Sequence, residues 1–140
     1  MRQTILTVVA VAISLVLVEG KSSAQTQTDK QPTMEERATQ EADRLATLLD
    51  LESWQIFYVD STLQHDYVAL EEEFKALTDA KVSNLDIYQI TQDKWADQID
   101  KTYQSIFNEE QWAKYLKSGA AKQQKAREKR KAKAEKNAEK

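Results

Sequence analysis

The 140-residue sequence has no cysteine, one proline, two glycines and one histidine. Without cysteine there can be no disulfide and no thiolate chemistry, and one histidine excludes a multi-histidine metal site within a single chain. So few breakers favour long helices over a fold with many tight turns. The sequence also has no nucleophile–base pair, glycine-rich phosphate loop or metal-ligand spacing. We therefore expect no enzyme, no cofactor and no metal site.

The first 24 residues have the pattern of a signal peptide. Arg2 supplies a positive charge, residues 5–18 (ILTVVAVAISLVLV) are apolar, and small residues stand at 22–24. The apolar run is shorter than the roughly 20 residues of a membrane-spanning helix. We expect cleavage after Ala24 and a mature chain that is soluble outside the cytoplasm.

Charge divides the remaining chain into two parts. Residues 25–118 hold nine basic and nineteen acidic side chains, a net charge of −10, whereas residues 119–140 hold nine basic and three acidic ones, a net charge of +6. The basic tail suits an anionic surface, the acidic body of another chain, or simple solubilisation. Nucleic acid is disfavoured because export is expected and no aromatic residues are interleaved for base stacking.

Hydrophobic periodicity predicts an all-α fold. A polar leader at 25–32, expected to be disordered, precedes expected helices at 33–49, 51–77 and 84–106. A short fourth helix is expected to start after Asn108 and to continue through Leu116. The longest has an apolar stripe spaced by three and four, and at 1.5 Å per residue it would run roughly 40 Å. Two such helices joined by a short turn predict an antiparallel hairpin within a four-helix chain. The tail has no apolar stripe, so we expect a frayed helix or solvated coil there. The stripe positions are Ile56, Val59, Leu63, Tyr67, Leu70, Phe74 and Leu77.

A six-residue frame recurs at three expected helix starts. It reads apolar, cap, two variable residues, polar, apolar, which is a capping box within a hydrophobic staple. The second residue of the frame is the predicted N-cap, and the side chain of the fifth residue is expected to accept the backbone N–H of that cap. Thr33 with Glu36 forms a further capping box. The three frames begin at Leu51 (cap Glu52, N3 Gln55), Val82 (cap Ser83, N3 Asp86) and Phe107 (cap Asn108, N3 Gln111).

Two of these frames, LESWQ at Leu51–Gln55 and FNEEQ at Phe107–Gln111, resemble the paired Leu-Thr-x-x-Gln motifs of the Spy/CpxP family. The family consists of exported, all-helical envelope-stress proteins of Gram-negative bacteria, and the resemblance covers Pro32 to about Lys117. Glu52 and Asn108 stand where the family has Thr, and the body is acidic where the best-known family chaperone has a positive cradle.

The resemblance implies a periplasmic protein whose four helices form a cradle, with two chains crossing through the long helices as a homodimer. It also implies ATP-independent holding of partly unfolded envelope proteins, or in some relatives the sensing of envelope stress or metal. The motif residues carried over are Leu51, Glu52, Gln55, Phe107, Asn108 and Gln111.

The aromatic residues are the candidates for client binding, because rings bury large areas with few torsions. The alternative is that they form the core and the dimer interface. Trp54 and Tyr58 lie off the stripe of the long helix, so we expect them to be exposed. His65 beside Asp66 is interpreted as a surface histidine, and the run Glu71–Glu73 as a solvated face. The candidates are Trp54, Tyr58, Tyr67, Trp95 and Trp112.

Two functions fit these observations. One is a chaperone that holds clients on an apolar and acidic concave face. The other is a regulatory or scaffold protein that docks on an envelope sensor or surface, for which the tail from Lys122 onward would be needed. Metal-responsive assembly is a third option.

Overall fold

The computed structural model describes residues 31–138, and within this range the chain is all-helical with no strand, which confirms the predicted all-α class. The predicted signal peptide and most of the predicted leader lie outside the described residues. Within them, no helix combines the length and apolar character needed to span a membrane. The elements are α1 (Met34–Leu49), α2 (Ser53–Asp79), α3 (Leu85–Ile106), α4 (Glu109–Tyr115), a π-helical link (Leu116–Ala120) and α5 (Ala121–Ala138).

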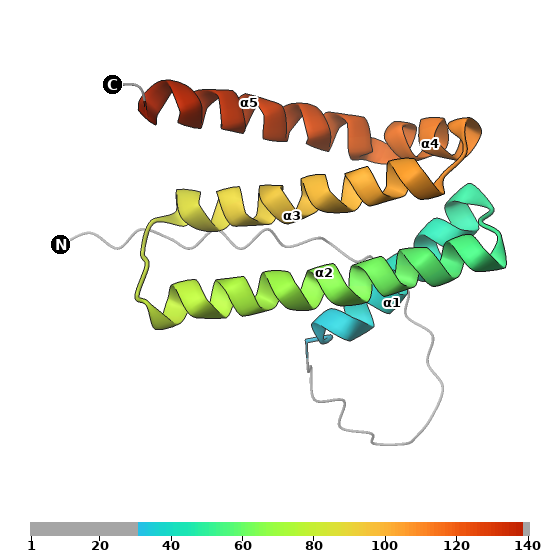
Figure 1. Cartoon of the computed structure of the whole chain (residues 1–140), viewed down its shortest axis with the longest axis horizontal. Helices are drawn as coiled ribbons and strands as arrows, with labels where there is room; N and C mark the ends of the chain where they lie inside the picture. The colour runs from blue at the N-terminus through green and yellow to red at the C-terminus, as the bar shows by residue number, and fades with distance from the viewer. Residues whose placement is uncertain (1–30, 139–140) are drawn as a thin grey trace, which may run out of the picture. The chain divides into compact units, whose positions relative to one another are not determined.

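The two longest helices, α2 and α3, lie side by side, and the chain reverses direction between them (Figure 1). α1 crosses α2, and α5 runs back along α3. The Lys94 ammonium on α3 binds both carboxylate oxygens of Glu73 on α2, at 2.5 and 2.8 Å. This ion pair gives one member of the Glu71–Glu73 run a structural role, while Glu71 and Glu72 are exposed as expected.

α1 begins at the predicted capping box. The Glu36 N–H donates to Thr33 Oγ1 at 3.2 Å, and the Thr33 N–H donates to Glu36 Oε2 at 2.8 Å. Each contact satisfies a backbone N–H that the first helical turn leaves without a partner. The helix ends at Asp50, whose φ of 52° lets the chain turn sharply into α2.

The buried core gathers at one end of the helices, where α1 ends, α2 begins and α3 passes into α4. The buried apolar residues of α2 are Val59 and Leu63, and its apolar stripe becomes half-exposed from Tyr67 onward. α3 follows the same gradient, with its buried residues in its last turns. The core consists of Ala38, Ala42, Leu45, Leu49, Leu51, Val59, Leu63, Tyr103, Ile106 and Phe107.

Three local predictions need correction. The apolar spacing of residues 33–49 puts Leu48 in the predicted stripe of the first helix, but Leu48 is 41% exposed. It lies about 60° from Leu45 around the helix and so at the edge of the stripe. α2 continues two residues beyond its predicted end at Leu77, to Asp79. The N-cap of α3 is Asn84 and not Ser83: its side chain accepts the Asp86 N–H at 2.9 Å, and Asn caps a helix as well as Ser does.

The largest correction concerns the tail. A frayed helix or solvated coil was expected from Gly119 onward, whereas α5 is a continuous helix of 18 residues whose Arg127 is buried. The chain turns into it at Gly119, which has a φ of 116°. That conformation favours glycine because a side chain would clash with the backbone. Polar contacts with α3 provide the docking that the missing apolar stripe does not.

The end of α2 has a left-handed residue that is not glycine. Lys81 has a φ of 56°, while the Val82 N–H donates to Leu77 O at 3.0 Å and the Lys81 N–H to Thr78 O at 2.9 Å. These two bonds form the Schellman motif, in which glycine is the usual left-handed residue.

Lys81→Gly should therefore raise the free energy of unfolding by about 0.5–1 kcal/mol, because relief of left-handed strain outweighs the added freedom of the unfolded chain. Denaturant unfolding monitored by circular dichroism measures it. Ala80→Gly is the matched control, since Ala80 has a φ of −77° and glycine there only adds freedom to the unfolded chain. Equal effects of the two substitutions would contradict the prediction.

Candidate functional site

The two glutamines of the motif frames bind each other at the buried end of the helices. Gln55 Nε2 donates to Gln111 Oε1 at 2.7 Å, and Gln111 Nε2 donates to Gln55 Oε1 at 3.0 Å. Both residues are buried although they lie 56 positions apart in the chain. After this reciprocal pairing, each side-chain amide still has one N–H group and one oxygen lone pair free. In a buried site both of these need hydrogen-bond partners.

Those remaining partners are supplied in the same way on both sides. Gln55 Oε1 accepts the N–H of Glu52 at 2.9 Å, and Gln111 Oε1 accepts the N–H of Asn108 at 3.0 Å. The second amide hydrogens go to carbonyls two residues before each cap: Gln55 binds Ile106 O at 2.9 Å and Gln111 binds Asp50 O at 3.5 Å. The two frames are therefore related by a local pseudo-twofold arrangement, which we call the glutamine clasp.

The other motif residues surround the clasp. Leu51 and Phe107 are buried, and the Phe107 ring stacks on Tyr103 with centroids 5.0 Å apart. Asn108 caps α4 by accepting the Gln111 N–H at 2.9 Å. The Glu52 carboxylate accepts the indole N–H of Trp54 at 2.7 Å. All six motif residues thus lie together at the start of α2 or of α4.

Away from the clasp, the half-buried parts of the helices line a groove of about 660 Å³. Its apolar walls come from Tyr67, Leu70 and Phe74 on α2 and from Trp95 and Ile99 on α3. Clefts of this size that carry aromatic walls and a few polar groups are the usual form of binding sites. The groove is the candidate binding site of this chain.

Two polar atoms in the groove walls are buried without a hydrogen-bond partner among the described residues: Trp95 Nε1 and Tyr103 Oη. Burial raises the pKa of the Tyr103 hydroxyl far above its usual value, so it remains a donor at any physiological pH. A buried donor without a partner costs roughly 1–3 kcal/mol, and native proteins rarely leave one unmatched. Both atoms have almost no exposed surface, so they belong to the packed walls of the groove and are not open to a ligand lying in it.

The charged rim of the groove differs from the expected acidic face. Arg37 and Arg44 of α1 and Arg127 of α5 line it, against the carboxylates of Glu41 and Asp100. Glu41 is bound bidentately by Arg44, with both contacts at 2.7 Å. The charged residues of this groove are therefore mixed in sign and not mainly acidic.

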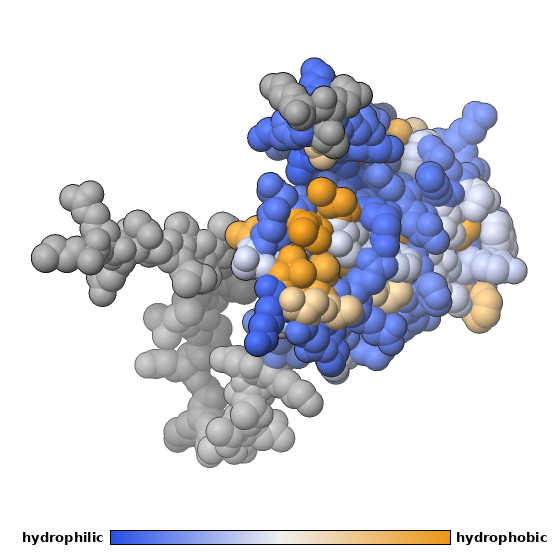
Figure 2. Space-filling model, turned by 60° about the vertical axis from the view of Figure 1, so that its left-hand side comes forward, coloured by the Kyte–Doolittle hydropathy of each residue, from blue (hydrophilic) through white to orange (hydrophobic). Residues whose placement is uncertain are grey.

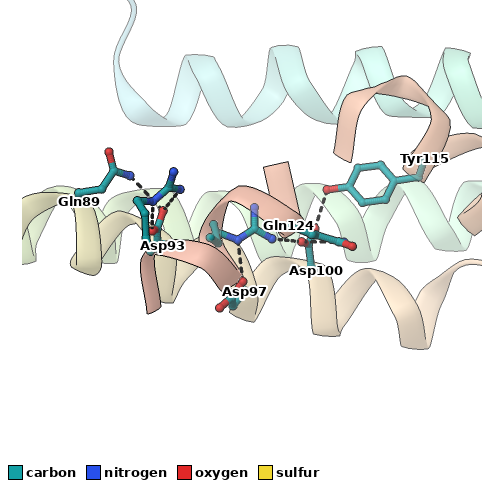
Figure 3. Close-up of polar contacts among 8 residues, drawn as sticks. Gln89, Asp93, Asp97, Asp100, Tyr115 and Gln124 are labelled. Atoms are coloured by element: carbon teal, nitrogen blue, oxygen red, sulfur yellow. Dashed lines mark hydrogen bonds and ion pairs between the residues drawn. The ribbon is translucent and has the colours of Figure 1, made fainter. Parts of the chain in front are cut away.

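One side of the groove is formed by α5, which is docked on α3 through a row of carboxylates (Figure 3). Asp93, Asp97 and Asp100 follow each other at spacings of four and three, so they share one face of α3. We call these three residues the aspartate row. Arg127 binds Asp97 at 2.6 Å and also Asp100, and Arg130 binds Asp93 at 2.6 and 2.8 Å.

The aspartate row is further saturated by neutral donors. Asp100 accepts the Tyr115 hydroxyl at 2.6 Å and Gln124 Nε2 at 3.0 Å, and Asp93 accepts Gln89 Nε2 at 3.0 Å. Burial, together with the bond to Asp100, raises the pKa of Tyr115, which keeps this hydroxyl protonated. Sequence reasoning missed this interface because it searched the tail for apolar residues only. The aspartates at 93, 97 and 100 and the arginines at 127 and 130 were the available signal.

The five aromatic candidates fall into three places. Tyr67 and Trp95 line the groove, and Trp112 packs against the core beside Tyr115. Trp54 and Tyr58 are 50% and 54% exposed at the start of α2.

An exposed cluster forms at that start. The Tyr58 ring contacts Trp54 at 6.2 Å and Phe57 at 5.6 Å between centroids, and Phe57, which sequence reasoning did not single out, is the most exposed of the three. The candidates therefore do not make one continuous surface.

The lone histidine lies outside the groove walls. His65 is exposed, and its Nδ1 lies 2.7 Å from Oδ1 of the buried Asp66. Within residues 31–138 no group of three His, Asp, Glu or Cys side chains is arranged to hold a metal ion.

No protein-family model matches this chain, and neither the curated proteins nor the solved structures include a similar one.

The clasp should act as a unit. Gln55→Ala and Gln111→Ala should each lower the free energy of unfolding by about 2 kcal/mol, because each leaves buried polar groups without partners. The double variant should lose less than the sum, with a coupling of about 1 kcal/mol or more. Gln104→Ala, an exposed glutamine near the end of α3, is the control and should have little effect. Additive effects in denaturant unfolding would refute a reciprocal pair.

The ion pairs should hold α5 in place. Arg127→Ala removes contacts to two carboxylates and should weaken the docking by about 2 kcal/mol, so amide hydrogen exchange in α5 should accelerate more than tenfold. Lys129→Ala, on the exposed side of the same helix, should leave exchange unchanged.

The same exchange measurement should depend on pH in one direction. The hydrogen bond from Arg130 holds the pKa of Asp93 below its ordinary 3.8. A carboxyl whose pKa is lower in the folded state stabilises that state above its unfolded pKa and loses this effect as pH falls. Protection of α5 should therefore persist at about pH 5 and decline below about pH 4. Loss of protection already at pH 6 would contradict this assignment.

Proposed function

We propose that this chain is an ATP-independent holding chaperone of the Spy/CpxP type, exported to the periplasm, that keeps apolar segments of partly unfolded envelope proteins in the groove. The observation that carries the proposal is the groove itself, with its aromatic and aliphatic walls. Unfolded segments offer what these walls lack, namely apolar side chains to cover the half-buried rings and aliphatic groups.

The mixed charge of the rim supports a broad choice of clients. Arg44 is paired with Glu41 and Arg127 with Asp100, so the charges of the rim largely neutralise each other and repel neither acidic nor basic clients. Binding of this kind needs no nucleotide, because release follows from the client burying its own apolar surface as it folds. The cradle and the antiparallel hairpin belong to this proposal.

Dimerisation through the long helices belongs to the proposal as well. Two exposed apolar surfaces supply area for it: the cluster of Trp54, Phe57 and Tyr58, and the first turns of α3 with Leu85, Ile87 and Ile90. The second surface is seen as a hydrophobic patch surrounded by hydrophilic residues in Figure 2. Neither lines the groove, so a dimer formed there would leave the groove open to clients.

The groove should be required for holding. The mature chain should suppress aggregation of a chemically unfolded client at near-stoichiometric amounts, measured by light scattering. Leu70→Gln and Trp95→Gln place polar groups in the apolar walls and should each weaken suppression several-fold. Leu85→Gln and Trp54→Gln make the same chemical changes at exposed positions outside the groove and should leave suppression intact.

The outcomes distinguish the alternatives. Loss of suppression with Trp54→Gln but not with Trp95→Gln would move the client site to the exposed cluster. No suppression by the unaltered chain across acidic and basic clients would reject the chaperone. It would favour the regulatory or scaffold protein that docks on an envelope sensor or surface. Deleting the tail cannot make this distinction, since Gln123 and Arg127 of α5 line the groove.

A further inference from the structure

Both arginines of α5 lie on the side that faces α3, and five of the six lysines of this helix lie on the opposite side, Lys131 being the exception. Arg127 and Arg130 face α3 and bind the aspartate row. At about 100° per residue, five lysines lie within an arc of about 80° centred roughly opposite to Arg127. They extend over about 21 Å of helix. We call them the lysine stripe: Lys122, Lys125, Lys129, Lys133 and Lys136.

The stripe is open to solvent and uncompensated. All five lysines are exposed, and none forms an ion pair with another residue of the described range 31–138. The acidic residues of α5, Glu128 and Glu135, lie about 100° or more from the centre of the stripe. The lysine stripe is therefore a straight row of positive charges, and the opposite face of the same helix is anchored on α3.

The residues between the lysines indicate how such a stripe binds. Only small or polar side chains, such as Ala126, Ala132 and Asn137, flank it, so nothing can insert into a hydrocarbon layer or stack on a base. Lysine acts as a compact, strongly hydrated point charge, which suits a diffuse anionic plane more than a bidentate site. A flat layer of lipid phosphates matches a straight row of five such charges.

The net negative charge of the body does not oppose this contact. The aspartates nearest to α5 are already bound by arginines. Exposed charges on the far side of α5 are largely screened, because the helix diameter of about 10 Å exceeds the Debye length of about 8 Å at physiological ionic strength. The stripe would thus meet an anionic surface with the groove-bearing helices held on the far side of α5.

We propose that the lysine stripe of α5 docks this protein on anionic phospholipid surfaces through their phosphate groups, without insertion. This site is separate from the groove and does not depend on the chaperone proposal. The aspartate row gives the stripe its rigidity, because it keeps α5 helical and turns the lysines outward.

The test is co-sedimentation of the protein with vesicles of phosphatidylglycerol and phosphatidylcholine, compared with phosphatidylcholine alone. Binding should require the anionic lipid and fall steeply with salt. The triple variant Lys125→Gln, Lys129→Gln and Lys133→Gln should bind about a hundredfold more weakly, since each lysine contributes about fivefold. The same three positions changed to Arg should retain binding.

A charge-matched control excludes a nonspecific effect. Lys75→Gln, Lys81→Gln and Lys101→Gln remove three charges from α2, its terminal turn and α3, and should change vesicle binding little. Equal losses in the two triple variants would overturn the proposal, as would no binding at low salt. Binding to a single-stranded oligonucleotide without binding to vesicles would also overturn it. Circular dichroism checks that α5 remains helical in each variant.

Discussion

The reciprocal hydrogen bonds between Gln55 and Gln111 are the interaction on which the rest of the structure depends. They join the start of α2 to the start of α4 and, through the adjoining carbonyls, the ends of α1 and α3. An apolar pair in their place would be close-packed but could rotate or slide, whereas amides have directional donors and acceptors. Because each glutamine also caps its own helix, the clasp sets both where two helices begin and how they meet.

Concentrating the core around the clasp has a consequence at the opposite end. Beyond Leu63 the facing residues of α2 and α3 are only half-buried, and rings such as Tyr67 and Trp95 are left lining the groove. The ion pair between Glu73 and Lys94 joins the helices there, but its side chains are 38% and 58% exposed, where such pairs contribute little. One end is therefore rigid and the other has few buried contacts, which is where adaptable binding surfaces are found.

Helix positions could be predicted closely because they rest on local signals. The apolar period placed α1, α2 and α3, and the Thr33 box placed the start of α1 to the residue. The α3 cap was missed by one residue because Ser83 and Asn84 are both good caps, and the sequence does not decide between them. The pairing of Gln55 with Gln111 joins residues 56 positions apart, so no local pattern contains it. The groove and its rim likewise depend on how four helices come together.

The tail shows why an apolar pattern is an incomplete guide to docking. An acidic body and a basic tail look like separate solvated segments when net charge is summed by region. When the charges are compared helix face by helix face, the acidic face of α3 is complementary to the arginine side of α5. The aspartate row repeats at helical spacing, and its members bind Arg127 and Arg130. Arginine suits this inner face because its planar fork binds two carboxylates while partly desolvated, whereas lysine loses more hydration on burial. The placement of both arginines inward and of five of the six lysines outward thus follows from the different hydration of the two cations, and it gives one helix both an anchored side and a free one.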